Sequence, residues 1–180
     1  MLQITIPGME FWDEKKEEFV YLDEKTLQLE HSLVSISKWE SRWHKPFLLK
    51  AEKTTAEILD YIQCMTVTQN VKPDVYLRLS KDNIDEIKKY IEDSKTATTF
   101  SEDKTGRGSR EVVTSELIYY WMIALNIPFE CQKWHLNRLL TLIRVCNVKN
   151  APPKKRSARE IMSRNAALNA ARRKQYNTRG

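Results

Sequence analysis

The stretch MLQITIPGMEFWDEKKEEFVYLDEKTLQLE, residues 1–30, predicts short strands at the start of a chain that is otherwise helical. Three of its segments read as strands from their alternation or their β-branched and aromatic side chains, namely residues 2–6, 17–22 and 26–30. Pro7-Gly8 ends the first segment, and Asp23-Glu24-Lys25 predicts a turn between the last two. Because two or three short strands are not stable alone, we expect a small antiparallel sheet or hairpin that packs on the rest of the chain.

Residues 32–150 follow the period of amphipathic helices. About five helices are indicated, two of them by capping boxes at Ser37-Lys38-Trp39-Glu40 and Thr54-Thr55-Ala56-Glu57, and three by apolar stripes over residues 80–92, 115–126 and 130–146. The segment SELIYYWMIALN, residues 115–126, is apolar on nearly every side, which is typical of a central core helix. Residues 93–113 are polar and predict a loop. The expected fold is α+β, mainly α-helical.

The basic excess of the chain lies at its C-terminal end. The whole chain has 30 Lys and Arg against 24 Asp and Glu, a net charge of +6. Residues 151–180 carry nine basic side chains and only Glu160 as an acid, a net charge of +8, so residues 1–150 carry −2. We therefore predict a single globular body over residues 1–150 and a basic tail over residues 151–180, joined by the stiff break Ala151-Pro152-Pro153.

The tail is predicted to form a helix over residues 157–175. Alanine and arginine favour helix, and Ser157-Ala158-Arg159-Glu160 matches a third capping box. Its apolar stripe is too thin to dock strongly on its own body, and its charge calls for an acidic or anionic partner. The candidate partner-binding residues are eight of its basic and large apolar side chains: Arg156, Arg159, Ile161, Arg164, Leu168, Arg172, Arg173 and Lys174.

Two kinds of partner suit this tail. An acidic or amphipathic protein would use Ile161 and Leu168 as helical anchors and the arginines as charged contacts at the rim. RNA or DNA would bind through phosphates with a strong dependence on salt, although only Tyr176 is available to stack on bases. A tail that only solubilises the protein is the third reading.

The body offers no recognisable catalytic or metal-binding constellation. Cys131 and His135 lie on adjacent turns of one predicted helix, a spacing that permits metal ligation or a thiolate–imidazole pair. No CxxC pair accompanies them, so a buried thiol and a helix-surface or capping histidine are favoured. For His44, a packed surface residue is favoured over a pH-sensitive ligand. Tyr119, Tyr120 or Trp121 can mark a subunit interface if the segment that holds them is not all core. We expect no enzymatic activity, metal or cofactor.

The composition also bears on location. Three cysteines, Cys64, Cys131 and Cys146, are an odd and sparse set, which indicates free thiols in a reducing compartment. No apolar run approaches the roughly 18–20 residues that span a bilayer, and the first residues do not match a secretion signal. We therefore expect no membrane partner.

Three stretches carry a resemblance to a known family: TLQLEHSLVSISKWESRWHKPFL (26–48), SELIYYWMIALNIPFECQKWHLNRLLTLIRVCN (115–147) and KKRSAREIMSRNAALNAARRKQYNTRG (154–180). Over nearly its whole length the chain resembles tail assembly chaperones of long-tailed, siphovirus-type bacteriophages. The resemblance implies a small non-enzymatic factor in the host cytoplasm that binds the tape measure protein, helps to recruit major tail protein and is absent from the finished virion. The strands expected in residues 1–30 depart from the small all-helical members of that family.

Two other functions stay open at this point. A virion structural protein, such as a connector or tail component, would have a permanent place in the particle. A nucleic-acid-binding factor would use residues 151–180. Self-association is compatible with each of these functions. The chaperone hypothesis leads because of the family resemblance, since the segregated charge suits a protein or a nucleic acid equally well.

Overall fold

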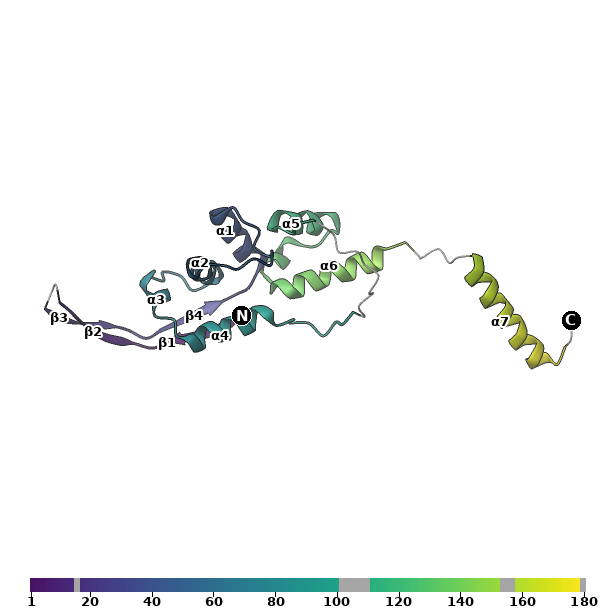
Figure 1. Cartoon of the computed structure of the whole chain (residues 1–180), viewed down its shortest axis with the longest axis horizontal. Coiled ribbons are helices and arrows are strands. Elements are labelled where there is room, and N and C mark those ends of the chain that lie inside the picture. The colour runs from purple at the N-terminus through teal and green to yellow at the C-terminus, as the bar shows by residue number, and fades with distance from the viewer. Residues whose placement is uncertain (15–16, 101–110, 153–157, 179–180) are drawn as a thin grey trace. The chain divides into compact units, whose positions relative to one another are not determined.

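The computed structural model describes four stretches of the chain: residues 1–14, 17–100, 111–152 and 158–178. The chain divides into two compact units, Met1–Asn147 and Val148–Gly180. In the described residues, the first unit combines a small antiparallel sheet with packed helices, and the second begins within the last of these helices and continues to a further one (Figure 1). The predicted class, α+β and mainly α-helical, is confirmed.

A long antiparallel hairpin forms the N-terminal part of the first unit. Its four strands are β1 (Leu2–Ile6), β2 (Met9–Asp13), β3 (Glu18–Leu22) and β4 (Lys25–Leu29). β1 pairs with β4 and β2 pairs with β3, and the register runs on unchanged from one pair to the other, with Ile6 opposite Lys25 and Met9 opposite Leu22. We call β1 and β4 the body half of this hairpin, and residues 9–22, which contain β2 and β3, the arm.

The strands predicted over residues 2–6, 17–22 and 26–30 are present, to within a residue, as β1, β3 and β4, but the predicted turn was wrong. Asp23-Glu24-Lys25 does not reverse the chain, because β3 runs on towards β4 and each of them pairs with a different strand. The chain reverses instead between β2 and β3. Residues 9–13, MEFWD, hold two acids, which are poor strand formers, so β2 had a weak sequence signal. Pairing with β3 outweighs that local preference.

Within the described residues, seven helical segments follow the hairpin, and the last of them extends three residues into the second unit. They are α1 (Leu33–Trp43), α2 (Thr55–Met65), α3 (Asp74–Leu77), α4 (Lys81–Glu92), α5 (Ser115–Ala124), the 3-10 helix η1 (Phe129–Lys133) and α6 (Leu136–Asn150). α1 packs on α2, α5 and η1, and α4 packs on β1. The core contains the buried side chains of Ile4 and Leu27 from the body half and of Trp39 from α1. The indole Nε1–H of Trp39 donates to the Glu57 carbonyl at 2.9 Å, which ties α1 to α2.

The starts of these helices confirm two predictions and correct a third. Thr54 and Glu57 form the predicted capping box of α2, and Ser80 caps the helix that was predicted over residues 80–92. The box predicted at Ser37 is wrong, because α1 begins earlier and its N-cap is Ser32, whose side chain accepts the Ser35 N–H.

The helix predicted over residues 130–146 is broken in two. η1 ends at Lys133 and α6 begins at Leu136. Between them, His135 forms a backbone bridge with Ser32, and the Leu136 N–H donates to the His31 carbonyl at 2.7 Å. A long-range contact with the end of the hairpin therefore sets the start of α6, and no local pattern marks it.

α5 is not the central core helix that its composition predicted. Ile118 and Met122 are fully buried, but Tyr120 and Ile123 are 63% and 60% exposed. The hydroxyl of the half-buried Tyr119 donates a hydrogen bond to Gln132 Oε1 at 2.9 Å. One side of α5 packs on the unit and another faces solvent, so apolar composition on every side did not mean burial on every side.

The second unit contains α7 (Ala158–Tyr176), whose described side chains are exposed. The helix predicted over residues 157–175 is thus present, although Ser157 of its predicted capping box lies outside the described residues. Of the helices that the structure describes, none has the length and apolar character needed to cross a bilayer.

Candidate functional site

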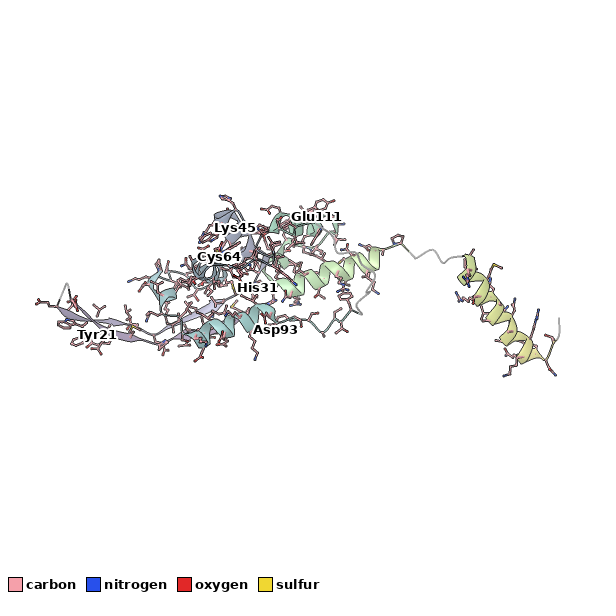
Figure 2. The ribbon with its side chains drawn as sticks, viewed as in Figure 1. Tyr21, His31, Lys45, Cys64, Asp93 and Glu111 are labelled. Carbon is pink, nitrogen blue, oxygen red and sulfur yellow. The ribbon has the colours of Figure 1, made fainter. Side chains whose placement is uncertain are left out.

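The arm carries large apolar side chains that the first unit leaves uncovered. Trp12, Phe19 and Tyr21 are 49%, 57% and 69% exposed. Trp12 and Phe19 are cross-strand partners, and their rings meet edge to face with centroids 4.9 Å apart. Figure 2 shows Tyr21 on the arm, beyond the helices that surround His31. Contiguous exposed apolar groups of this kind mark interaction sites on soluble proteins.

The aromatic face of the arm continues the core face of the body half. In a strand, residues two apart share a face, and so do directly paired residues of neighbouring strands. In the body half this face carries the buried pair Ile4 and Leu27. Followed through the unbroken register, the same face of the arm carries two more pairs, Glu10 with Tyr21 and Trp12 with Phe19. The unit thus buries this face in the body half and leaves it exposed on the arm.

The base of the arm is fastened to the end of α3. Arg78, the C-cap residue of α3, donates from Nη1 to the carbonyls of Pro7 at 3.2 Å and Asp23 at 3.3 Å. Gly8 lies against the opposite strand, where an added Cβ would be 3.0 Å from the Leu22 carbonyl oxygen. These contacts fix the point at which the arm leaves the helices.

The candidate tail residues lie along α7, except Arg156, which is outside the described residues. At 100° per residue, Ile161, Arg164, Leu168 and Arg172 fall on one side of the helix, which we call the mixed face. Ile161 and Leu168 are 46% and 45% exposed. The mixed face therefore offers two apolar anchors with a guanidinium beside each.

The remaining candidates do not share that face. Arg159, Arg173 and Lys174 lie on other sides of α7 by the same helical geometry. The structure thus divides the predicted set into a group that can act together on one partner surface and a group that supplies charge around it. Charge counting predicted the segment but not this division.

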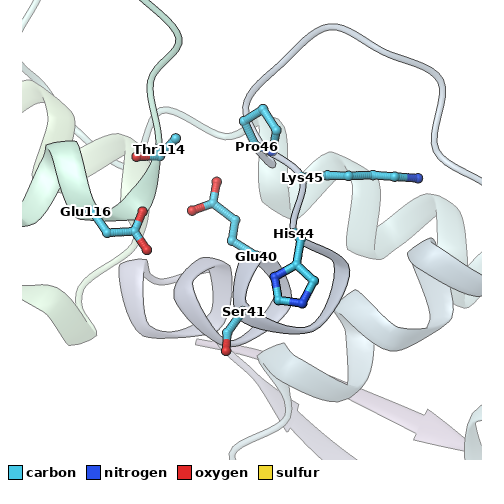
Figure 3. A pocket seen from close by; sticks show the side chains of 7 residues that line it. All are labelled: Glu40, Ser41, His44, Lys45, Pro46, Thr114 and Glu116. Atoms are coloured by element: carbon cyan, nitrogen blue, oxygen red, sulfur yellow. The ribbon is translucent and has the colours of Figure 1, made fainter.

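An open cavity of about 390 Å³ lies between α1 and the start of α5 (Figure 3). Glu40 and Glu116 both line it, an arrangement that invites comparison with a catalytic carboxylate pair. The Glu40 carboxylate, however, accepts the backbone N–H groups of Phe47 and Ser115, each at 2.7 Å. The Glu116 carboxylate accepts hydrogen bonds from the backbone N–H of Glu116 itself and from the Thr114 hydroxyl, and these lower its pKa. The two carboxylates therefore bind the backbone at the α1–α5 junction, and Glu40 does not cap Ser37 as predicted.

A buried polar cluster links the end of β4 to α2, α4 and the start of α6. His31 Nδ1 lies 2.5 Å from the Tyr61 hydroxyl oxygen, and the rings of His31 and His135 meet edge to face with centroids 5.1 Å apart. His135 Nε2–H donates to the Tyr90 carbonyl at 3.0 Å, and the Tyr90 hydroxyl donates to Glu30 at 2.8 Å. No sequence motif marked His31, because its partners come from distant segments.

Burial keeps the two imidazoles of this cluster neutral. Burial, with a smaller contribution from His135, lowers the pKa of His31 to about 3, and burial also lowers the pKa of His135. Burial raises the pKa of the Tyr61 hydroxyl well above its ordinary value. His135 is 6% exposed, so a helix-surface position is excluded. The residue directly precedes α6, and its carbonyl accepts the Leu139 N–H at 3.1 Å, which fits the capping position that was the other half of the prediction. The cluster acts as a polar part of the core.

The three cysteines form no disulfide. Cys64, Cys131 and Cys146 are all free thiols. Cys131 is buried as predicted, and burial raises the pKa of its thiol. Within the described stretches of the chain, no group of three or more His, Cys, Asp and Glu side chains is placed to hold a metal ion.

No protein-family model, no curated protein and no solved structure matches the chain. The two surfaces that stand out are thus identified by their own residues: the aromatic face of the arm and the mixed face of α7. Sequence reasoning missed the arm, where the only signal was a set of aromatic residues set among acids in MEFWDEKKEEFVYL.

Proposed function

We propose that the chain is a non-enzymatic protein-binding factor that acts as a phage tail assembly chaperone. In this proposal it binds the tape measure protein in the host cytoplasm and assists assembly of the tail. The observation that carries the protein-binding part is the mixed face of α7, where Ile161 and Leu168 are exposed beside arginines. The choice of the tape measure protein as partner follows from the sequence resemblance.

The mixed face suits a long helical partner with acidic side chains. Ile161 and Leu168 are seven residues apart, so two apolar anchors repeat along one line of the helix. Complete burial of such a side chain contributes about 1.5–3 kcal/mol. Arg164 and Arg172 contribute chiefly to the rate of encounter and to the register of the partner. A chaperone of this kind covers apolar surface on its client until assembly buries it.

The test is a titration of purified tape measure protein with the purified full-length chain. Replacing both anchors, Ile161→Ser with Leu168→Ser, should weaken binding by at least about tenfold. The matched control, Arg159→Ser with Arg173→Ser, changes two residues away from the mixed face and should weaken binding much less. Failure of the wild-type chain to bind, or unchanged binding by the anchor variant, contradicts the proposal.

Nucleic-acid binding is the second candidate, supported by the nine basic residues of 151–180. It makes the opposite prediction for the same variants. Phosphates respond to charge, so Arg159→Ser with Arg173→Ser should weaken RNA or DNA binding and reduce its salt dependence, while the anchor variant should change little. A salt titration with both variants separates the two candidates.

A structural role in the virion is distinguished from a chaperone role by the protein composition of the purified particle. A chaperone leaves the assembly, whereas a connector or tail component stays in it at fixed stoichiometry. Mass spectrometry of purified virions should find the chain absent or in traces. Abundant copies favour the structural alternative over the chaperone.

A further inference from the structure

The aromatic face of the arm has the character of a surface that a helix covers. In the body half of the same hairpin, the face that carries Ile4 and Leu27 is buried in the core beneath the helices of the unit, with α4 packed on β1. On the arm the continuation of this face carries Trp12, Phe19 and Tyr21, all half-exposed or more. An isolated two-stranded ribbon is marginally stable in water, so cover over this face would stabilise it as well as bury it.

The charge of the arm indicates the sign of the partner. Residues 9–22 hold five acidic and two basic side chains, a net charge of −3, and Asp23 and Glu24 follow directly. On the aromatic face itself, Glu10 is the cross-strand partner of Tyr21. A matching partner therefore presents apolar side chains together with basic ones, so that an arginine meets Glu10 where an apolar group meets Trp12 and Phe19.

The chain itself contains a helix that presents apolar side chains together with basic ones. The mixed face of α7 sets Ile161 and Leu168 beside Arg164 and Arg172, and the segment 151–180 carries +8. α7 has 19 residues, about 28 Å at 1.5 Å per residue, and a five-residue strand of the arm is about 17 Å long. The helix is therefore long enough to cover the whole aromatic face.

We infer that the arm of one molecule binds the mixed face of α7 from a second copy of this chain. The arm and α7 belong to separate compact units, and their charges and apolar groups are complementary. The contact joins two different surfaces, so it is heterologous and repeats from copy to copy, which gives a ring if it closes and a chain of molecules if it does not. This contact does not depend on the tape measure protein, with which it would compete for α7.

The test is sedimentation velocity of the purified full-length chain at about 50 mM salt, with two double variants and their mixture. The arm variant is Trp12→Ser with Phe19→Ser, and the α7 variant is Ile161→Ser with Leu168→Ser. Each variant alone should self-associate at least about tenfold more weakly than the wild type. Mixed in equal amounts, they should form a dimer and grow no further, because only one intact contact remains, between the arm of the α7 variant and α7 of the arm variant.

The matched control is Ile123→Ser, which removes another exposed apolar side chain, 60% exposed on α5. It should associate like the wild type, and circular dichroism should show that every variant is folded. Raising the salt to about 500 mM should weaken association of the wild type, since opposite charges meet in the contact.

Several results would overturn the inference. Association that persists in the arm variant indicates contact between α7 helices, and association that persists in the α7 variant indicates contact between arms. A wild type that stays monomeric at every concentration excludes a second copy as the occupant, whether α7 then docks within its own chain or not at all. Binding of tape measure protein by the arm variant is a separate readout, so failure here leaves the proposed function standing.

Discussion

The two halves of the N-terminal hairpin have one register but different surroundings. In the body half Leu27 is 0% exposed, whereas Phe19 of the arm, on the same face of the ribbon, is 57% exposed. Strand pairing decides which side chains share a face. The helices packed on that face decide whether its apolar groups contribute to the stability of the fold or remain available for binding. Each of the following substitutions or conditions tests this division.

The largest effect is expected in the body half. Leu27→Ala removes a fully buried side chain and leaves a cavity beneath the helices. The free energy of unfolding, measured with urea, should fall by about 2–5 kcal/mol. A loss below about 1 kcal/mol would show that the body half does not belong to the core.

The second-largest effect is expected from acid, which should lower the free energy of unfolding through His31 at the end of the body half. Above pH 6.5, the ordinary pKa, His31 is neutral in the folded and unfolded chains, so its full contribution is present. As the pH falls towards the folded pKa of about 3, only the unfolded chain takes up the proton, and stability is lost across that window. From pH 7.5 to pH 5 the loss from His31 should be about 2 kcal/mol.

Urea unfolding at a series of pH values measures this effect. The rings of Tyr61 and His135 meet the imidazole, Glu30 acts on both of these neighbours, and His135 should add a loss of the same sign. His31→Gln, which keeps a polar partner for Tyr61, serves as the control and should flatten the dependence between pH 5 and 7. Equal slopes for this variant and the wild type would assign the loss to other groups.

A smaller effect is expected at the joint between the halves. Gly8→Ala sets a Cβ 3.0 Å from the Leu22 carbonyl oxygen and 3.3 Å from the Glu24 nitrogen, so the backbone must shift. We expect a loss of about 1 kcal/mol. Hydrogen exchange should quicken at the amides of β2 and β3 and stay unchanged in α2. Equal quickening in both would show that the joint and the core unfold as one.

The smallest effect on stability is expected on the arm. Trp12→Ser removes a tryptophan side chain, as Trp39→Ser does in the core, but Trp12 is 49% exposed. The free energy of unfolding should change by no more than about 0.5 kcal/mol. Trp39→Ser, at 1% exposure, is the matched comparison and should cost several times more. Similar losses for the two would remove the distinction between core and arm.

The sequence allowed the parts with local causes to be predicted. The capping box of Thr54 and Glu57, the helix predicted over residues 80–92 and the helical tail each depend on residues close in sequence, and each is present. The start of α6 could not be predicted, because it depends on a hydrogen bond from Leu136 to His31. β2 likewise depends on its pairing with β3.

The candidate site divides in the same way. Composition located the basic segment that contains α7, since charge is a sum over neighbours in the chain. It did not locate the arm, because the exposure of Trp12 and Phe19 depends on where the helices stop covering the hairpin. Uncovered apolar side chains are identified only when three-dimensional neighbours are known.

Glu40 sets an order of events during synthesis of the chain. Its carboxylate takes the N–H of Phe47, seven residues on, and that of Ser115, seventy-five residues on. On the ribosome, at roughly 5–20 residues per second, the second donor emerges several seconds after the first. α1 and the turn that follows it can therefore settle while α5 is still being made. The carboxylate then receives the first turn of α5 at a position already prepared for it.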